Sequence, residues 1–200
     1  MNLSAEIGEA FVVFVAAIFT QNILLAYFLG FCPFIGVSRE IKAAFGLGLA
    51  VIFVLTCTTS LNWVAYHLVL VPLGLEYFRF ILFIIIIAAF VQLVEMAVER
   101  YSPFLYQQLG VFLPLITVNC AIFGAALFMV IRDYSFLVTI GYAFGSGVGW
   151  FLAIMAMAGI RQKLATDRIP RGLQGPGITL ILAGLMALGF IGFAGVLQGR

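Results

Sequence analysis

Charged residues divide this chain into long uncharged runs that are almost entirely apolar. Five of the six runs reach the roughly 20 residues that a helix needs to cross a bilayer core. Unbroken segments such as ILFIIIIAAF lack the alternation that strands of a membrane β-barrel require. The pattern predicts an all-α polytopic membrane protein with six transmembrane helices, over 11–31, 44–68, 79–98, 110–131, 136–160 and 176–197.

The composition excludes several other classes of protein. Only 9% of the residues are charged and 64% are hydrophobic, whereas about a quarter of a soluble domain is charged. A formal net charge of +2 gives no reason to infer a nucleic-acid partner. The single histidine and the glycine runs inside apolar segments provide neither a catalytic triad nor a nucleotide-binding loop. The composition therefore predicts the lipid bilayer as a partner and no catalysis by this chain alone.

The positions of lysine and arginine predict the orientation in the membrane. If the N-terminus lies outside, seven basic residues fall in cytoplasmic loops and three fall on the outer side. The cytoplasmic set is Arg39, Lys42, Arg100, Arg161, Lys163, Arg168 and Arg171, and the outer set is Arg79, Arg132 and Arg200. This asymmetry predicts that both termini face the periplasm.

The two halves of the chain, about 1–100 and 101–200, resemble each other within a single transmembrane domain, 1–200. GFCPF stands near the first predicted helix and LPLITVNC in the fourth, and the next helix of each half carries a glycine run. Three helices per half make this an inverted repeat, a class that places its working site at broken helices near the bilayer midplane. Because proline removes a helix hydrogen bond, Pro33 and Pro114 are the expected break points in the first and fourth spans.

Three cysteines are candidates for a metal site. Cys57 is best explained as a packing residue, because a buried cysteine behaves as a small apolar side chain. Cys32 and Cys120 occupy related places in the two halves, which makes them candidate ligands. Two thiolates cannot complete a zinc or iron–sulfur site, so a second chain or another cofactor would supply the remaining ligands. A disulfide is the less favoured alternative.

Glu95 is a carboxylate in an apolar helix, one turn beyond Gln92 and near the predicted cytoplasmic end of the third span. A charge at the centre of a membrane helix costs about 2.5–3.5 kcal/mol on insertion scales, and less near the interface. Two interpretations stay open. Glu95 is an ion or proton contact at the cytoplasmic entrance, or it is an interfacial residue paired with Arg100.

The motifs LPLITVNCAIFG, RDYSF, FGSGVGW, GITLILAGLMALGF and FGLGLAVIFVLT resemble the E subunits of the sodium-translocating NADH:quinone reductases (Nqr). The similarity covers nearly the whole chain. The segment FLGFCPFIGVS is closer to the paralogous A subunits of the Rnf complexes, which are ferredoxin:NAD oxidoreductases. Three other motifs favour the quinone reductase over the Rnf complex: TVNCAIFG, RDYSF and GSGVGW.

The resemblance implies a site, a cofactor and a partner. It implies that Cys32 and Cys120 ligate an intramembrane [2Fe–2S] cluster that relays electrons and couples redox chemistry to sodium transport. It also implies that a homologous six-helix protein of opposite orientation, of the type of the Nqr D subunit or the Rnf E subunit, supplies the other two ligands. The resemblance further implies that the complex lies in the bacterial inner membrane and reduces ubiquinone. NADH and flavins would bind other subunits of this complex. Without this resemblance, the residues favour a metal-free inverted-repeat ion transporter with Glu95 at its site. Beside the resemblance, the transporter is the alternative.

Overall fold

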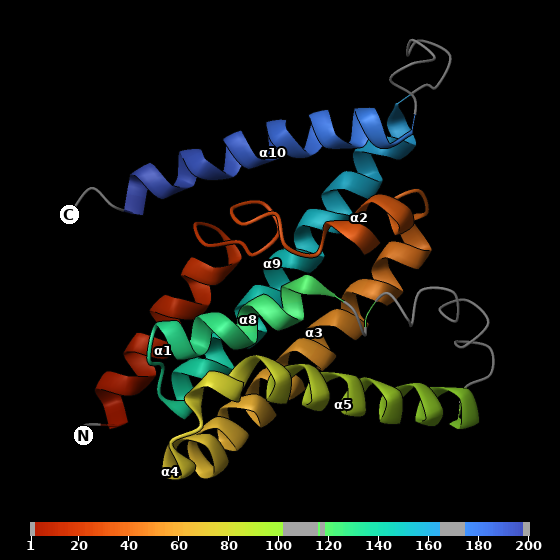
Figure 1. Ribbon diagram of the computed structural model, residues 1–200. Helices are drawn as coiled ribbons and strands as arrows, with labels where there is room; N and C mark the ends of the chain where they lie inside the picture. The colour runs from red at the N-terminus through yellow and green to blue at the C-terminus, as the bar shows by residue number, and fades with distance from the viewer. Residues whose placement is uncertain (1–2, 102–115, 117–118, 165–174, 198–200) are drawn as a thin grey trace.

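The computed structural model describes residues 3–101, 116, 119–164 and 175–197, and all regular structure within these ranges is helical (Figure 1). The α-helices are α1 (Leu3–Ile18), α2 (Phe31–Val37), α3 (Ile41–Ala65), α4 (Val71–Leu73), α5 (Arg79–Tyr101), α8 (Cys120–Ile131), α9 (Phe136–Lys163) and α10 (Pro176–Leu197). A π-helical turn, Tyr66–Leu70, joins α3 to α4, and a 3-10 turn, Glu76–Phe78, precedes α5.

Three helical stretches of the described chain are long and apolar enough to cross a membrane: Ile41–Leu73, Glu76–Ala97 and Phe136–Lys163. They correspond to the spans predicted over 44–68, 79–98 and 136–160. Helix α10 has the bounds predicted for the last span, and α8 is a shorter apolar helix. The prediction of an all-α polytopic membrane protein is therefore confirmed, and three of its six spans meet the criteria of length and composition.

Helices α3 and α9 form the centre of the molecule and run antiparallel. Gly48 of α3 packs against Phe151 of α9, and the ring of Trp63 near the other end of α3 lies 5.1 Å from the ring of Phe136. Rising residue numbers in one helix thus meet falling numbers in the other. Figure 1 shows α10 and α5 on opposite outer sides of this central pair.

A stripe of glycines on α9 lets helix α1 approach closely. A Cβ at Gly145 would lie 2.6 Å from the carbonyl oxygen of Phe14, and one at Gly141 would lie 3.0 Å from that of Ala10. A Cβ at Gly149 would lie 3.0 Å from the carbonyl oxygen of Ile18. Small residues at such an interface allow two membrane helices to pack backbone against backbone.

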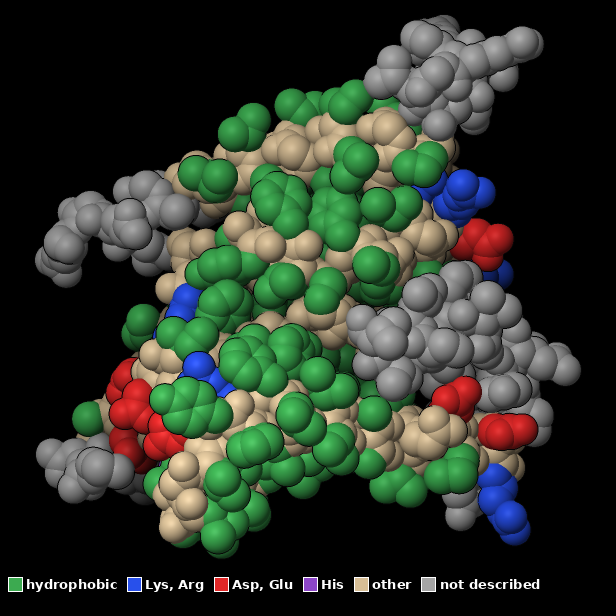
Figure 2. Space-filling view, in the orientation of Figure 1, with side chains coloured by type: hydrophobic (Ala, Val, Ile, Leu, Met, Phe, Trp, Pro, Cys, Tyr) green, Lys and Arg blue, Asp and Glu red, His purple; other side chains and the backbone are tan. Residues whose placement is uncertain are grey.

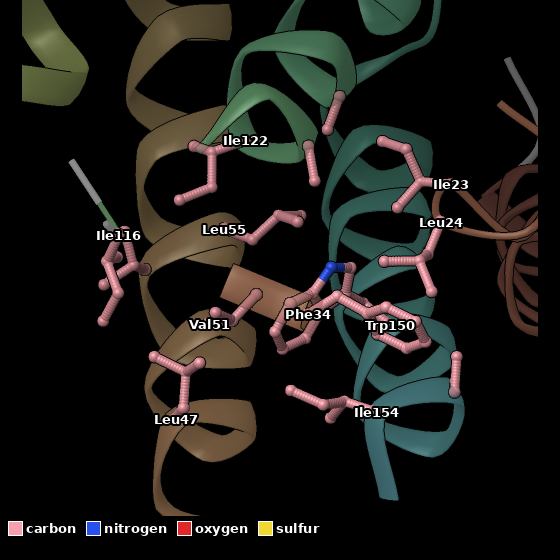
Figure 3. Close-up of a cluster of buried hydrophobic side chains, with 14 of the residues drawn as sticks. Ile23, Leu24, Phe34, Leu47, Val51, Leu55, Ile116, Ile122, Trp150 and Ile154 are labelled. Carbon is pink, nitrogen blue, oxygen red and sulfur yellow. The ribbon is translucent and has the colours of Figure 1, made fainter. Parts of the chain in front are cut away.

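The buried core lies between these helices, whereas the outer helices expose apolar side chains. Figure 3 shows part of the core, with Phe34 of α2 and Trp150 of α9 among its fully buried members. On α5, Ile81 and Ile85 are more than half exposed, and Leu188 of α10 is 67% exposed. In Figure 2, hydrophobic side chains cover the visible face between two margins where charged side chains gather. An apolar surface between two charged margins is what a protein that spans a lipid bilayer presents to the lipid.

The first predicted span, 11–31, is not one continuous helix. Helix α1 ends at Ile18 and α2 begins at Phe31, so the break expected in the first span is present. The side chain of Asn22 holds this break: its Oδ1 accepts hydrogen bonds from the backbone N–H groups of Leu24 and Leu25, and its Nδ2 donates to the carbonyl of Ile18. Asn22 is fully buried, as irregular backbone at membrane depth requires.

The prediction that Pro33 is the break point is wrong. Pro33 is the third residue of α2, and the irregular segment lies before it. A proline in the first helical turn replaces an N–H that has no partner within the helix anyway, so it is tolerated there. Of the fourth predicted span, 110–131, the structure describes α8. Pro114 lies outside the described residues.

Candidate metal centre at the broken helices

Each predicted ligand lies in the first turn of a short helix. Cys32 is the second residue of α2 and Cys120 is the first residue of α8. Each short helix leads through a few residues into one of the two long central helices, α2 into α3 and α8 into α9. Each of the two cysteines therefore lies in a short helix that precedes one of the two long central helices.

The sulfur of Cys120 contacts the chain just before Cys32. The backbone N–H of Gly30 donates a hydrogen bond to the Cys120 Sγ over 2.9 Å. Asn119 caps α8, because its Oδ1 accepts a hydrogen bond of 3.0 Å from the Ala121 N–H. The N-terminus of this 12-residue helix favours a bound group that carries negative charge. These contacts bring the surroundings of the two predicted ligands together across 90 positions of the chain.

Gly30 is held in a conformation and a space that suit glycine alone. Its φ of 85° lies in the left-handed region. A Cβ there would lie 2.5 Å from Trp150 Nε1, 3.0 Å from Ala121 Cβ and 3.1 Å from Asn119 Oδ1. The backbone before Cys32 thus packs directly against both α8 and α9.

The two cysteines differ in exposure. Cys32 is exposed and Cys120 is half-buried, and both are free thiols. Among the described residues, no third histidine, cysteine or carboxylate joins them to make a group able to hold a metal ion. Cys57 is a half-buried residue of α3. The exposed position of Cys32 leaves one side of the centre open to ligands from another chain.

The residues present fit half of an iron–sulfur site. Thiolates are the usual ligands of iron–sulfur clusters, and hydrogen bonds from N–H groups to sulfur are among the features that tune them. Two further N–H groups in this region, Trp150 Nε1 and Asn119 Nδ2, are buried and have no hydrogen-bond partner within the described chain. A sulfur-rich group with a negative charge is an acceptor that such donors suit.

Two arginines hold the broken first span at its ends. Arg161, near the end of α9, donates from Nη1 to the carbonyl of Ile35 at 2.9 Å and to the Ser38 hydroxyl at 2.6 Å, which ties down the C-terminal end of α2. Arg132, in the connection before α9, donates to the side chain of Gln21 and, over 3.0 Å, to the Tyr27 hydroxyl. The segment that leads to Cys32 is thereby anchored to the second half of the chain.

Glu95 lies on α5, a different helix from those that carry the cysteines, and its side chain is half-buried. Within the described residues it forms no ion pair, so the pairing with Arg100 that the sequence left open is not formed. Arg100 is exposed in the last turn of the same helix. Glu95 is therefore a carboxylate with no cationic partner among the described residues, on a helix that is long and apolar enough to span a membrane.

Sequence reasoning missed Gly30, Trp150 and Arg161 as parts of the centre. The motif GFC places Gly30 beside the ligand motif, and FGSGVGW ends in one of only two tryptophans in the chain. These signals existed, but their meaning depends on contacts between residues far apart in the sequence, such as Gly30 and Cys120, which are 90 positions apart.

The fold and the site define a polytopic membrane protein in which two short helices, each with a cysteine in its first turn, meet beside an antiparallel pair of long helices. The chain belongs to the family described as Rnf-Nqr subunit, membrane protein, which it matches over residues 10–197.

Within this family, the chain is similar to the E subunits of one reductase. The chain is 53% identical over 189 residues to the E subunit of the Na(+)-translocating NADH-quinone reductase of Serratia proteamaculans (strain 568), a match that covers 92% of this chain and 96% of the relative. It is 54% identical over 189 residues to the E subunit from Yersinia enterocolitica, with the same coverage. It is 54% identical over 188 residues to that of Yersinia pestis (strain Pestoides F), covering 91% of this chain and 95% of the relative. The resemblance to E subunits of this reductase that the motifs indicated is confirmed.

Proposed function

We propose that this chain is an integral-membrane subunit of a sodium-translocating NADH:quinone reductase, in which Cys32 and Cys120 supply two ligands to an intramembrane [2Fe–2S] cluster. The observation that carries the proposal is the hydrogen bond from the Gly30 N–H to the Cys120 sulfur, because it brings the two cysteine-bearing elements to one place. The identity of more than 50% to E subunits of this reductase, over nearly the whole chain, supports the assignment to this complex. The A subunit of the Rnf complex is the alternative.

The residues of this chain bind and position the group. A bound [2Fe–2S] cluster supplies one-electron transfer between carriers on the two sides of the membrane. Cys32 and Cys120 would bind it through their thiolates, the N-terminus of α8 favours the negative charge, and the Gly30 N–H stabilises the Cys120 sulfur. Flavins and NADH are bound by other subunits in this proposal.

A homologous six-helix membrane protein of opposite orientation, of the type of the Nqr D subunit, would provide the two missing thiolates. The exposure of Cys32 supports this, since a partner can reach it. The antiparallel packing of α3 and α9, each preceded by a short cysteine-bearing helix, supports an inverted 3+3 repeat with six spans.

The membrane orientation follows from the charges. Lys42 lies in the first turn of α3 and Arg161 in the last turn of α9, and the antiparallel packing places these two ends on the same side. Helix α1 begins and α10 ends on one common side of the molecule (Figure 1). By the positive-inside rule, the side of Lys42 and Arg161 is cytoplasmic and both termini face the periplasm of a bacterial inner membrane.

Glu95 is proposed as an ion contact in the sodium path. Replacing it by glutamine removes the charge and keeps the shape. We expect Glu95→Gln to raise the sodium concentration that gives half-maximal turnover by about tenfold, because an electrostatic contact of about 1.4 kcal/mol is lost. The rate of quinone reduction by the purified complex, measured against sodium concentration, checks this. Glu99→Gln, one turn further along α5, is the control, and an equal response of both variants would contradict a specific role for Glu95.

The relay function is tested by where electrons leave the complex. We expect the complex with Cys32→Ser to keep NADH oxidation by a soluble artificial acceptor, which takes electrons from the NADH-binding subunit, and to lose quinone reduction. Cys57→Ser should keep both activities. If Cys32→Ser reduces quinone at the wild-type rate, the metal-free transporter becomes the better account of this chain.

A further inference from the structure

The side chain of Trp150, at the end of the glycine run of α9, has a hydrogen-bond donor that nothing in the described chain satisfies. Trp150 is fully buried, and its indole N–H has no acceptor there. Leaving such a buried donor unpaired destabilises the folded protein. The other tryptophan, Trp63, has its donor satisfied, because its Nε1 donates to the Tyr134 carbonyl over 2.9 Å. Of the two tryptophans, Trp150 is therefore the one whose indole N–H lacks an acceptor within the described chain.

That place adjoins the candidate metal centre. The Trp150 Nε1 packs against Gly30, where a Cβ would come within 2.5 Å of it, and the N–H of the same Gly30 points at the Cys120 sulfur. Figure 3 shows the Trp150 side chain in the core beside Phe34, two residues beyond Cys32 on α2.

A second unpaired donor lies on the other side of Gly30. Asn119 precedes Cys120 and is buried. Its Oδ1 caps α8, but its Nδ2 has no partner within the described residues. The side-chain amide also packs against Gly30, since a Cβ there would lie 3.1 Å from Oδ1. Two buried N–H donors from different elements thus flank the residue that contacts the sulfur, and the described part of this region lacks an acceptor for either.

We propose that Trp150 Nε1 and Asn119 Nδ2 donate hydrogen bonds to sulfur atoms of the group held by Cys120, and that they raise its reduction potential. This inference rests on the proposed function. A donor aimed at sulfur stabilises the more negative, reduced form more than the oxidised form, so its loss lowers the potential. Trp150 is a positioning and tuning residue that belongs to α9, whereas the ligands belong to α2 and α8.

The test is a redox titration of the purified complex, followed by electron paramagnetic resonance, for the wild type, Trp150→Phe and Asn119→Ser. Serine keeps a cap for α8 but has no amide donor. Both variants should keep the signal and shift its midpoint to lower potential. For Trp150→Phe we expect about a tenfold fall in the reduced-to-oxidised ratio at the wild-type midpoint, which is about 59 mV for a one-electron couple. Trp63→Phe is the matched control and should leave the midpoint unchanged.

A second readout addresses the hydrogen bond directly and leaves the Trp150 side chain unchanged. In wild-type complex grown with 15N-indole tryptophan, pulsed resonance should show a 15N coupling to the signal, and this coupling should persist in Trp63→Phe. Absence of the coupling, or an unchanged midpoint in Trp150→Phe with the signal retained, overturns the inference alone. A wild-type signal that survives Cys120→Ala overturns the proposed function as well.

Discussion

Complexes carrying Cys32→Ala or Cys120→Ala are expected to lose two iron atoms each while the subunits stay assembled. In the proposed centre, each substitution would remove one of four thiolates, and a two-iron cluster would lack a complete ligand set. Assembly should persist, because Cys32 is exposed and Cys120 is only half-buried, so neither side chain fills a large part of the core. Iron per complex, measured by elemental analysis on the purified protein, checks this.

Cys57→Ala provides the matched control for this prediction. It removes the same atoms from a half-buried position on α3. The iron content should equal that of the wild type. Loss of iron in all three variants would point to a general effect of weakened packing, and would contradict the assignment of ligands to Cys32 and Cys120 alone.

Gly149→Leu is expected to prevent accumulation of the protein in the membrane. A side chain at this position meets Asn22 Nδ2 at 2.8 Å and the carbonyl oxygens of Ala17 and Ile18 at 3.0 Å from its first carbon atom. Backbone atoms cannot move aside as a flexible side chain can, and overpacking a core costs about 1–3 kcal/mol or more. The substitution also displaces the asparagine that holds the break in the first span, so both packing and the approach to Cys32 are lost.

The amount of this protein in isolated membranes, measured by immunoblot, checks this expectation. Gly159→Leu is the control on the same helix, since a Cβ there meets nothing within 4 Å. It should accumulate normally. Similar levels of the two variants would show that the contact between α1 and α9 is not tight in the assembled protein.

Part of the fold was predictable because it depends on local composition. The partition between lipid and water acts on each segment separately, so uncharged apolar runs identified the helices that became α3, α5 and α9. The position of the break in the first span was not predictable in the same way. Pro33 is the obvious local signal, yet the break is set by the side chain of Asn22 and by the left-handed Gly30.

In the candidate site too, local sequence signals were predictable and contacts between distant residues were not. The similarity of the two halves singled out Cys32 and Cys120, and the structure places both in the first turns of short helices. The groups that surround them could not be read from the sequence, because Trp150 meets Gly30 across 120 positions of the chain. A tryptophan after a glycine run predicts packing, and only the fold shows that its N–H lies beside the residue that contacts the Cys120 sulfur.

The most direct test of the central claim is whether Cys32 and Cys120 serve one cluster. Electron paramagnetic resonance spectra of the reduced complex should be recorded for the wild type, for each single alanine variant and for the double variant. If the two thiolates share a centre, both single variants lose the same [2Fe–2S] signal, and the double variant loses nothing further. A signal that persists in either single variant, or two different signals lost in turn, would contradict the account.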